Sequence, residues 1–300
     1  MITITDLRKT FRRTEAVAGL NLEVPQGKVT AFLGPNGAGK STTIKCLLNL
    51  HRPSSGSINV FGVDSRQLGP ASFTEIGYVS ENMKLPLWMT VDQFFNYCRP
   101  LYPNWDGDFE KKLLDQFDLP SKTKLKDLSR GMRMKAALLS SLAYRPKLVV
   151  LDEPFSGLDP LVRDEFIRGL LELTEEEGWT VFISSHDIEE VQRLADRIAI
   201  INRGQLALDE TRESLQSRFR NVEVVLPEGS NLPADIPAEW LHAEMAGRTV
   251  RFADSQFESD AKLASSLGEH LPAAAAPQIH PMSLREIFVA LARAYRLEGN

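Results

Sequence analysis

The sequence predicts an α/β core that is interrupted by a helical insert and followed by a small α+β appendage. Apolar segments of strand length recur along the first two thirds of the chain, at 28–33, 75–80, 148–151, 180–184 and 197–202. Between about 85 and 145 the apolar residues recur at helical spacing instead. We therefore expect a first domain over 1–220, with the insert inside it, and an accessory domain over 221–300.

Local signals support the individual elements. Alternating polar and apolar residues predict the strands of an antiparallel β subdomain, at 2–5, 16–24 and 57–63. Thr90 and Gln93 form a capping-box pattern at the start of a helix in the insert, and Ser283 and Glu286 form another before a terminal helix. A helix in the core is expected to stop near Gly178.

The accessory domain carries the charge imbalance of the chain. We expect its elements to be strands at 222–226, 241–245 and 249–252, a helix near 257–267, and a loop over 272–277. It holds six basic and eleven acidic residues, which accounts for the whole formal net charge of −5. A regulatory domain, a brace for a dimer and simple packing are all compatible with this segment.

Composition also limits the classes of function. The remaining residues balance in charge, so we expect no nucleic-acid partner, which would normally call for a basic face. The two cysteines, Cys46 and Cys98, form no disulfide framework, which fits a reducing compartment. No stretch approaches ~18 uninterrupted apolar residues, so we expect a soluble, cytosolic chain.

A phosphate-binding loop directly follows the predicted strand 28–33. It matches the pattern GxxxxGK(S/T), with the residues Gly34, Pro35, Asn36, Gly37, Ala38, Gly39, Lys40 and Ser41, and Thr42 follows. In a strand–loop–helix context such a loop binds phosphate through backbone N–H groups at the helix N-terminus. Lys40 is expected to reach the β- and γ-phosphates, and Ser41 to bind Mg²⁺. The core is therefore predicted to be that of a P-loop NTPase that binds a nucleoside triphosphate with Mg²⁺.

The strand 148–151 ends in an acidic pair. Asp152 is placed to hold the Mg²⁺ ion, and Glu153 to act as general base for the attacking water. Alone, such a pair equally suits the start of a helix. Its position after four apolar residues, downstream of a phosphate loop, favours the catalytic interpretation.

Between these motifs lies the loop Ser129-Arg130-Gly131-Met132. A serine hydroxyl and a glycine at a helix start suit an anion, although a plain helix N-cap is the alternative. The order of these motifs resembles the ATP-binding-cassette ATPases, whose usual pattern here is Leu-Ser-Gly-Gly-Gln. Ser129 and Gly131 match that pattern, whereas Arg130 and Met132 depart from it. The resemblance implies that Ser129 and Gly131 complete the ATP site of a second subunit.

The same resemblance implies roles for further residues. Asp159 matches the family's loop that crosses the dimer interface. His186 matches the family's histidine that contacts the γ-phosphate, although a lone histidine in a sequence more often has a structural role. Phe11 occupies the place of the adenine-stacking aromatic, with a core phenylalanine as the rival. Glu81 stands where the family has glutamine, and its carboxylate is expected to ligate Mg²⁺.

The loop Ser129–Met132, Glu81 and the segment 101–106 resemble the exporter-type subgroup of bacterial cassette subunits. The resemblance therefore implies the ATP-hydrolysing subunit of such a transporter, with Lys40, Glu153 and His186 as catalytic residues. Its expected partners are a second ATP-binding subunit and a multi-spanning permease, which would hold it on the cytoplasmic face of the cell membrane. The permease is expected to dock near 81–105, unless the apolar residues there only pack inside the insert. A soluble cassette ATPase acting on nucleic acid or the ribosome is the main alternative. A simple P-loop GTPase or kinase would leave Ser129, Asp159 and His186 unexplained.

Overall fold

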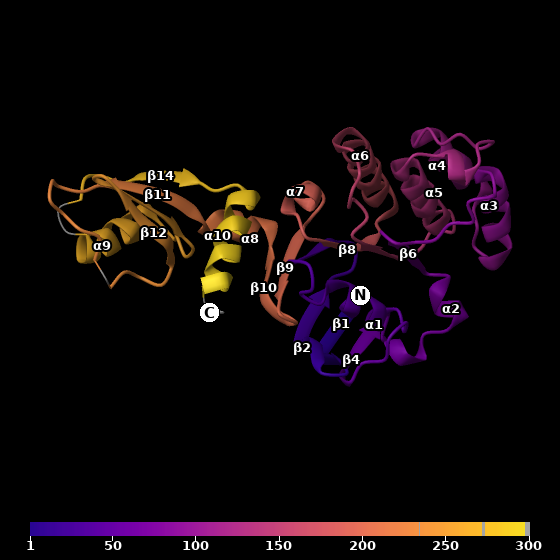
Figure 1. Ribbon diagram of the computed structural model, residues 1–300, viewed down its shortest axis with the longest axis horizontal. Helices are drawn as coiled ribbons and strands as arrows, with labels where there is room; N and C mark the ends of the chain where they lie inside the picture. The colour runs from indigo at the N-terminus through magenta and orange to yellow at the C-terminus, as the bar shows by residue number, and fades with distance from the viewer. Residues whose placement is uncertain (234, 272–273, 298–300) are drawn as a thin grey trace. The chain divides into compact units, whose positions relative to one another are not determined.

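The computed structural model describes residues 1–233, 235–271 and 274–297. The chain divides into two compact units, Met1–Asp209 and Glu210–Asn300. The first unit has the predicted α/β core with a helical insert, and the second is the predicted α+β appendage (Figure 1).

A six-stranded sheet forms the centre of the first unit. Its strands, in spatial order, are β10 (Gln205–Thr211), β9 (Arg197–Asn202), β3 (Val29–Leu33), β8 (Thr180–Ser185), β7 (Leu148–Asp152) and β6 (Ile76–Ser80). β3 pairs in parallel with β8 and β9, and β7 with β6 and β8. Because parallel strands place their carboxyl ends at one edge, the residues that follow β3, β7 and β8 come together there.

The predicted antiparallel subdomain is a second sheet of four strands. These are β2 (Thr14–Val24), β1 (Ile2–Phe11), β4 (Ser55–Val60) and β5 (Val63–Asp64). Helix α1 (Lys40–Leu47) shares a buried apolar cluster with both sheets: Ile44 of the helix packs with Ile58 of β4 and Phe182 of β8. Burial on two sides therefore holds the start of α1 in a defined place.

The insert consists of α3 (Val91–Cys98), α4 (Gly107–Gln116) and α5 (Arg130–Leu142), which gather beyond β6 in Figure 1. The Thr90 capping box is confirmed: Gln93 N–H donates to Thr90 Oγ1 at 3.2 Å, and Thr90 N–H to Gln93 Oε1 at 3.0 Å. The other helices of this unit are α2 (Pro70–Phe73), α6 (Pro160–Glu177) and α7 (Ile188–Val191), with short 3₁₀ turns at Ser65–Gln67, Arg99–Leu101 and Leu125–Asp127. Helix α6 stops at Gly178, as predicted, and this glycine has a left-handed conformation.

Close backbone packing anchors α5 to the edge strand β6. The hydroxyl of the buried Tyr144 donates to the carbonyl of Ile76 at 2.8 Å, and Ser141 Oγ donates to the carbonyl of Tyr78 at 3.1 Å. Between them, a Cβ on Gly77 would lie 2.6 Å from the carbonyl oxygen of Ser141. Glycine is therefore required at position 77 for the helix to approach the sheet this closely.

The second unit is a four-stranded antiparallel sheet with helices. Its strands are β12 (Trp240–Ala246), β13 (Thr249–Asp254), β11 (Arg220–Val225) and β14 (Gln278–Pro281), and its helices α8 (Arg212–Arg218), α9 (Asp260–His270) and α10 (Leu284–Leu297). Trp240 stacks on Phe252 at 4.3 Å between ring centroids, and α9 contributes Leu263 and Leu267 to the same core. The capping box from Ser283 to Glu286 is confirmed.

The division between the units precedes the predicted boundary at 220, because α8 belongs to the second unit. The Arg218 guanidinium donates to the carbonyl of Ser255, and Phe257 N–H donates to the carbonyl of Arg218 at 2.9 Å. Of the loop predicted over 272–277, residues 272 and 273 lie outside the described residues.

We predict that Gly77→Ala destabilises the first unit, because the new methyl group overlaps the Ser141 carbonyl and displaces α5. Overpacking of this kind costs about 1–3 kcal/mol, or roughly 2–12 °C in melting temperature for a unit of this size. Differential scanning calorimetry measures the shift. Gly107→Ala is the matched control, since its Cβ would meet nothing within 4 Å. Equal melting temperatures for the two variants would contradict the packing argument.

Candidate nucleotide site

The predicted phosphate loop lies in the turn between β3 and α1. Gly37 and Gly39 adopt φ values of 82° and 113°, which glycine tolerates without steric cost. A Cβ on Gly39 would lie 2.4 Å from the carbonyl oxygen of Ala16, so this position requires glycine. No side chain of the described residues caps the start of α1, whose first N–H groups therefore suit a phosphate. The loop over 34–42 fits the ligand that the sequence predicts.

Lys40 has its ammonium group inside this loop. The residue is 5% exposed, and Nζ donates to the carbonyls of Gly34 at 2.7 Å and Pro35 at 3.2 Å. Nζ also pairs with Glu153 Oε1 at 3.1 Å. A buried charge is tolerated only with such partners. The loop and the acidic pair, which lie more than a hundred residues apart in sequence, are thus joined by one ion pair.

Asp152 is the last residue of β7 and faces α1. Its Oδ1 accepts hydrogen bonds from Ser41 Oγ at 2.9 Å and from Ser184 Oγ at 2.8 Å. A carboxylate beside a hydroxyl is an oxygen donor set of the kind that Mg²⁺ binds. Ser41 and Asp152 therefore fit the predicted metal role.

Glu153 is held in an unusual backbone conformation. Its φ is 53°, in the left-handed region that non-glycine residues rarely adopt. Its N–H donates to the Ser184 carbonyl at 3.2 Å and to Ser184 Oγ at 3.1 Å, which fixes this conformation. Strain of this type concentrates at functional sites. Here it directs the carboxylate between Lys40 and His186.

His186 completes the cluster at the end of β8. Its Nδ1 lies 2.8 Å from Glu153 Oε2. This hydrogen bond is the main reason that the pKa of the imidazole lies above its ordinary value, while partial burial opposes the shift. The ring therefore keeps its proton to higher pH than a free imidazole does, and a proton on Nδ1 is donated to the carboxylate. The three predicted catalytic residues form one continuous chain, Lys40–Glu153–His186.

Glu81 lies at the start of the loop after β6. Its Oε1 accepts from Arg130 Nη2 at 3.0 Å and from Ser156 Oγ at 2.8 Å. One carboxylate oxygen of Glu81 is therefore already bound by two side chains of the protein. Its predicted role as a magnesium ligand remains a prediction.

Phe11 ends β1 and is 41% exposed, so the core alternative is wrong for this ring. It makes an edge contact with His51 at 5.3 Å between centroids, and Lys9 Nζ lies 4.8 Å from its centre. An exposed aromatic face suits stacking on a base. Stacking on adenine remains a prediction.

The residues predicted to act on a second subunit lie at helix starts. Ser129 caps α5, accepting from Met132 N–H at 3.2 Å, and Asp159 caps α6, accepting from Leu161 N–H at 2.9 Å. Both side chains are exposed. A Cβ on Gly131 would lie 2.4 Å from a methyl carbon of Val162, so this glycine is also required for close packing of α5 on α6.

Comparisons with known proteins decide the family. A family model described as ABC transporter matches residues 17–156. A lantibiotic transport ATP-binding protein of Streptococcus pyogenes is 35% identical over 229 residues, which cover 74% of this chain and 96% of that relative. The chain belongs to the ABC transporter family. A bacitracin transport ATP-binding protein of Enterococcus faecalis is 30% identical, with 73% of this chain and 72% of that relative covered.

Other matches agree with this assignment. An uncharacterised ABC transporter ATP-binding protein of Synechocystis is 33% identical, and the chain spans 63% of its length. A bacterial ABC transporter cassette solved as a dimer has a TM-score of 0.64 at 24% identity, over 70% of this chain and 98% of that structure, which shows the cassette fold. As a member of this family, the chain is an ATP-binding cassette and an ATPase.

Two residues of the cassette site escaped the sequence analysis. Ser184 bridges Asp152 and the Glu153 backbone, and Glu190 lies within 4.8 Å of the Glu153 and His186 ligand atoms. Burial raises the pKa of the Glu190 carboxyl, which accepts from Ser185 Oγ. Polar residues at the end of the apolar strand 180–184 were the available signal for Ser184.

We predict that Glu153→Gln lowers the pKa of His186 in the cassette. The amide retains the shape of the side chain but removes the charge that stabilises the imidazolium. Titration of the imidazole resonances by NMR measures the change, with His186 assigned from the spectrum of His186→Gln. Glu172→Gln, an exposed change on α6, is the matched control. A His186 pKa that is equal in Glu153→Gln and wild type would contradict the assigned cause.

Proposed function

We propose that this chain is the ATP-hydrolysing subunit of a bacterial transporter, powering outward transport through separate membrane subunits. The observation that carries the proposal is the convergence of Lys40, Glu153 and His186 at the carboxyl edge of the sheet, beside Asp152 and Ser41. Relatives named for bacitracin transport and lantibiotic transport support a transport role. A sulfate/thiosulfate import ATP-binding protein of Salmonella typhi is also 32% identical, so the outward direction rests on the exporter-type motifs of the sequence.

The contacts suggest how the residues act in hydrolysis. The N–H groups of the phosphate loop and Lys40 would hold the β- and γ-phosphates of ATP. Ser41 and Asp152 would hold Mg²⁺, which would neutralise charge on the phosphate oxygens. In the structure, Lys40 and His186 both bind the Glu153 carboxylate. A γ-phosphate would compete for these two donors, which would leave Glu153 to accept a proton from the attacking water.

The exposed helix caps support a site shared between two subunits. Ser129 and Asp159 lie on the starts of α5 and α6, outside the Lys40–Glu153–His186 chain. In our proposal each chain offers its phosphate loop to one ATP and its Ser129 loop, with Asp159, to another. Two such chains, identical or different, would then enclose two ATP molecules, and their closure would drive the membrane subunits.

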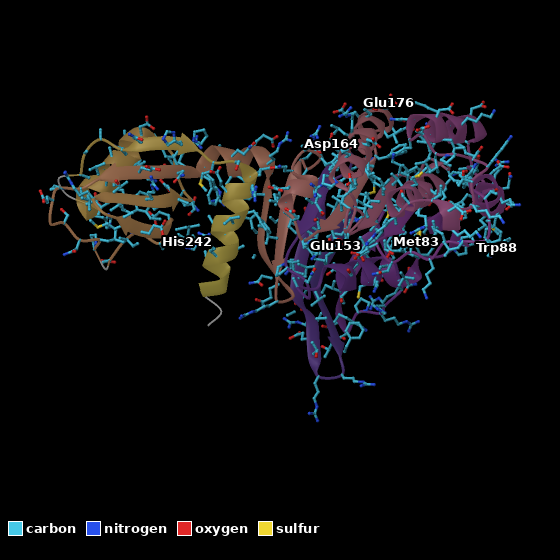
Figure 2. The ribbon with its side chains drawn as sticks, turned by 45° about the horizontal axis from the view of Figure 1, so that its top comes forward. Met83, Trp88, Glu153, Asp164, Glu176 and His242 are labelled. Atoms are coloured by element: carbon cyan, nitrogen blue, oxygen red, sulfur yellow. The ribbon has the colours of Figure 1, made fainter. Side chains whose placement is uncertain are left out.

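The loop after β6 offers a surface for the permease. Trp88 is 70% exposed and Leu87 is 49% exposed, whereas Met89 is buried, so packing inside the insert accounts for only part of the predicted cluster. In Figure 2, Trp88 lies at the rim of the first unit. A cavity of about 360 Å³ opens nearby, lined by residues that include Leu87 and Met134. Exposed apolar side chains beside a cavity are typical of a protein contact.

Anchorage at the membrane would depend on this contact. No helix in the described part of the chain is long and apolar enough to cross a bilayer. The proposed location is therefore peripheral, on the cytoplasmic face of the cell membrane.

We predict that the tagged chain recovers a multi-spanning protein from detergent-solubilised membranes of its own cells. Trp88→Ala should weaken the association by roughly thirtyfold or more, because truncation of a tryptophan that is an interface hot spot costs about 2 kcal/mol or more. Leu50→Ala is the matched control, since Leu50 is a comparably exposed apolar residue outside the insert. Recovery of ribosomes or nucleic acid, without a multi-spanning protein, would overturn the transport assignment in favour of a soluble cassette ATPase.

A further inference from the structure

Two of the three positions at which this chain departs from its family pattern, Arg130 and Glu81, contact each other. Arg130 takes the place of a glycine in the Ser129 loop, and Glu81 the place of a glutamine after β6. Their side chains form an ion pair, with Arg130 Nη2 3.0 Å from Glu81 Oε1. Forty-nine residues separate them in sequence. The pair therefore links two loops that belong to different parts of the cassette.

The Glu81 carboxylate connects to a third loop as well. Its Oε1 accepts from Ser156 Oγ at 2.8 Å, and the Glu81 N–H donates to the Asp152 carbonyl at 2.9 Å. Ser156 belongs to the segment that leads from the acidic pair to Asp159. One carboxylate thus holds together the loop after β6, the loop after β7 and the start of α5.

Arg130 occupies a site shaped for its guanidinium. Gly157 has φ of 65°, and a Cβ there would lie 2.4 Å from Arg130 Nη1. The guanidinium therefore lies directly against the Gly157 backbone. A side chain at 157 would displace the end of the Arg130 side chain, so the glycine leaves room for the ion pair with Glu81.

The energetics favour a role in orientation over one in stability. The side chains are 49% and 31% exposed, and an exposed ion pair contributes only about 0–1 kcal/mol. Arg130 is also the first residue of α5, where the helix dipole disfavours a cation. Glu81 offsets that charge. Because Ser129 is the adjacent N-cap, fixing Arg130 also fixes the hydroxyl that would face the partner's ATP.

We propose that Glu81 and Arg130 are a positioning pair that ties the Ser129 loop to the loops at the chain's own ATP site. The inference rests on the proposed shared site. The pair connects residues beside one ATP, through Asp152 and Glu81, to the Ser129 loop, which serves the other ATP. In this proposal Glu81 orients the start of α5 and does not bind magnesium.

A double-mutant cycle on ATPase rate tests the pair. Glu81→Gln and Arg130→Gln should each lower kcat roughly tenfold, and the double variant should lose no more than the worse single variant, because both changes break one interaction. Arg130→Lys keeps a cation beside Glu81 and should retain most of the rate. Lys111→Gln, which breaks an exposed ion pair with Asp108 on α4, is the matched control and should leave the rate unchanged. Additive losses of roughly a hundredfold in the double variant would overturn the proposal.

Two further measurements separate the rival explanations. If Glu81 ligates Mg²⁺, Glu81→Gln alone will raise the Mg²⁺ concentration needed for half the maximal rate. The positioning pair predicts equal Mg²⁺ dependence in wild type and both single variants. Size-exclusion chromatography of Glu153→Gln with ATP checks the shared site itself. If Glu153→Gln forms an ATP-dependent dimer but the losses in the double-mutant cycle are additive, only the role of the Glu81–Arg130 pair is refuted. If no ATP-dependent dimer forms, the shared site on which that role rests is refuted.

Discussion

The ammonium group of Lys40 is buried, and the need to compensate its charge organises the site. Two loop carbonyls and the Glu153 carboxylate surround it, and the same carboxylate binds His186. These partners come from the ends of β3, β7 and β8, which parallel pairing brings to one edge of the sheet. The arrangement makes the phosphate loop, the base and the histidine a single electrostatic unit. Loss of the Glu153 carboxylate would leave the buried charge of Lys40 without its anionic partner.

The cluster of Lys40, Glu153 and His186 is only part of what the proposed reaction requires. The helix starts that carry Ser129 and Asp159 have their own local hydrogen bonds, so these loops are already formed in the single chain. They are exposed, as residues that meet a second subunit must be. Anchorage of α5 to β6 through Gly77 and Tyr144 then determines where the Ser129 loop lies relative to the rest of the first unit. The pair of Glu81 and Arg130 adds a second connection at the helix start.

The sequence predicted the fold class, and it pointed to Lys40, Glu153 and His186, which the structure brings together, because both inferences depend on local patterns. Apolar strands that lead into Asp152 and Ser184, and a glycine-rich loop before a helix, can each be recognised within a single segment. The contact between Glu81 and Arg130 cannot be read from the sequence, although each residue by itself departs from the family pattern. These two residues are 49 positions apart in sequence, and whether such side chains meet depends on tertiary packing. The same limit applies to Gly77, because the need for glycine there comes from a helix more than sixty residues further along the chain.

The central claim is that one chain holds two half-sites, and mixing of two inactive variants tests it most directly. Lys40→Ala disables the phosphate loop, and Ser129→Asp keeps an N-cap residue while placing a negative charge toward the partner's phosphate. Each variant alone should lack ATPase activity. An equal mixture should recover about a quarter of the wild-type number of working sites, because half the dimers are mixed and each mixed dimer has one intact site. Full activity of Ser129→Asp alone, or no recovery at any mixing ratio, would contradict the shared site.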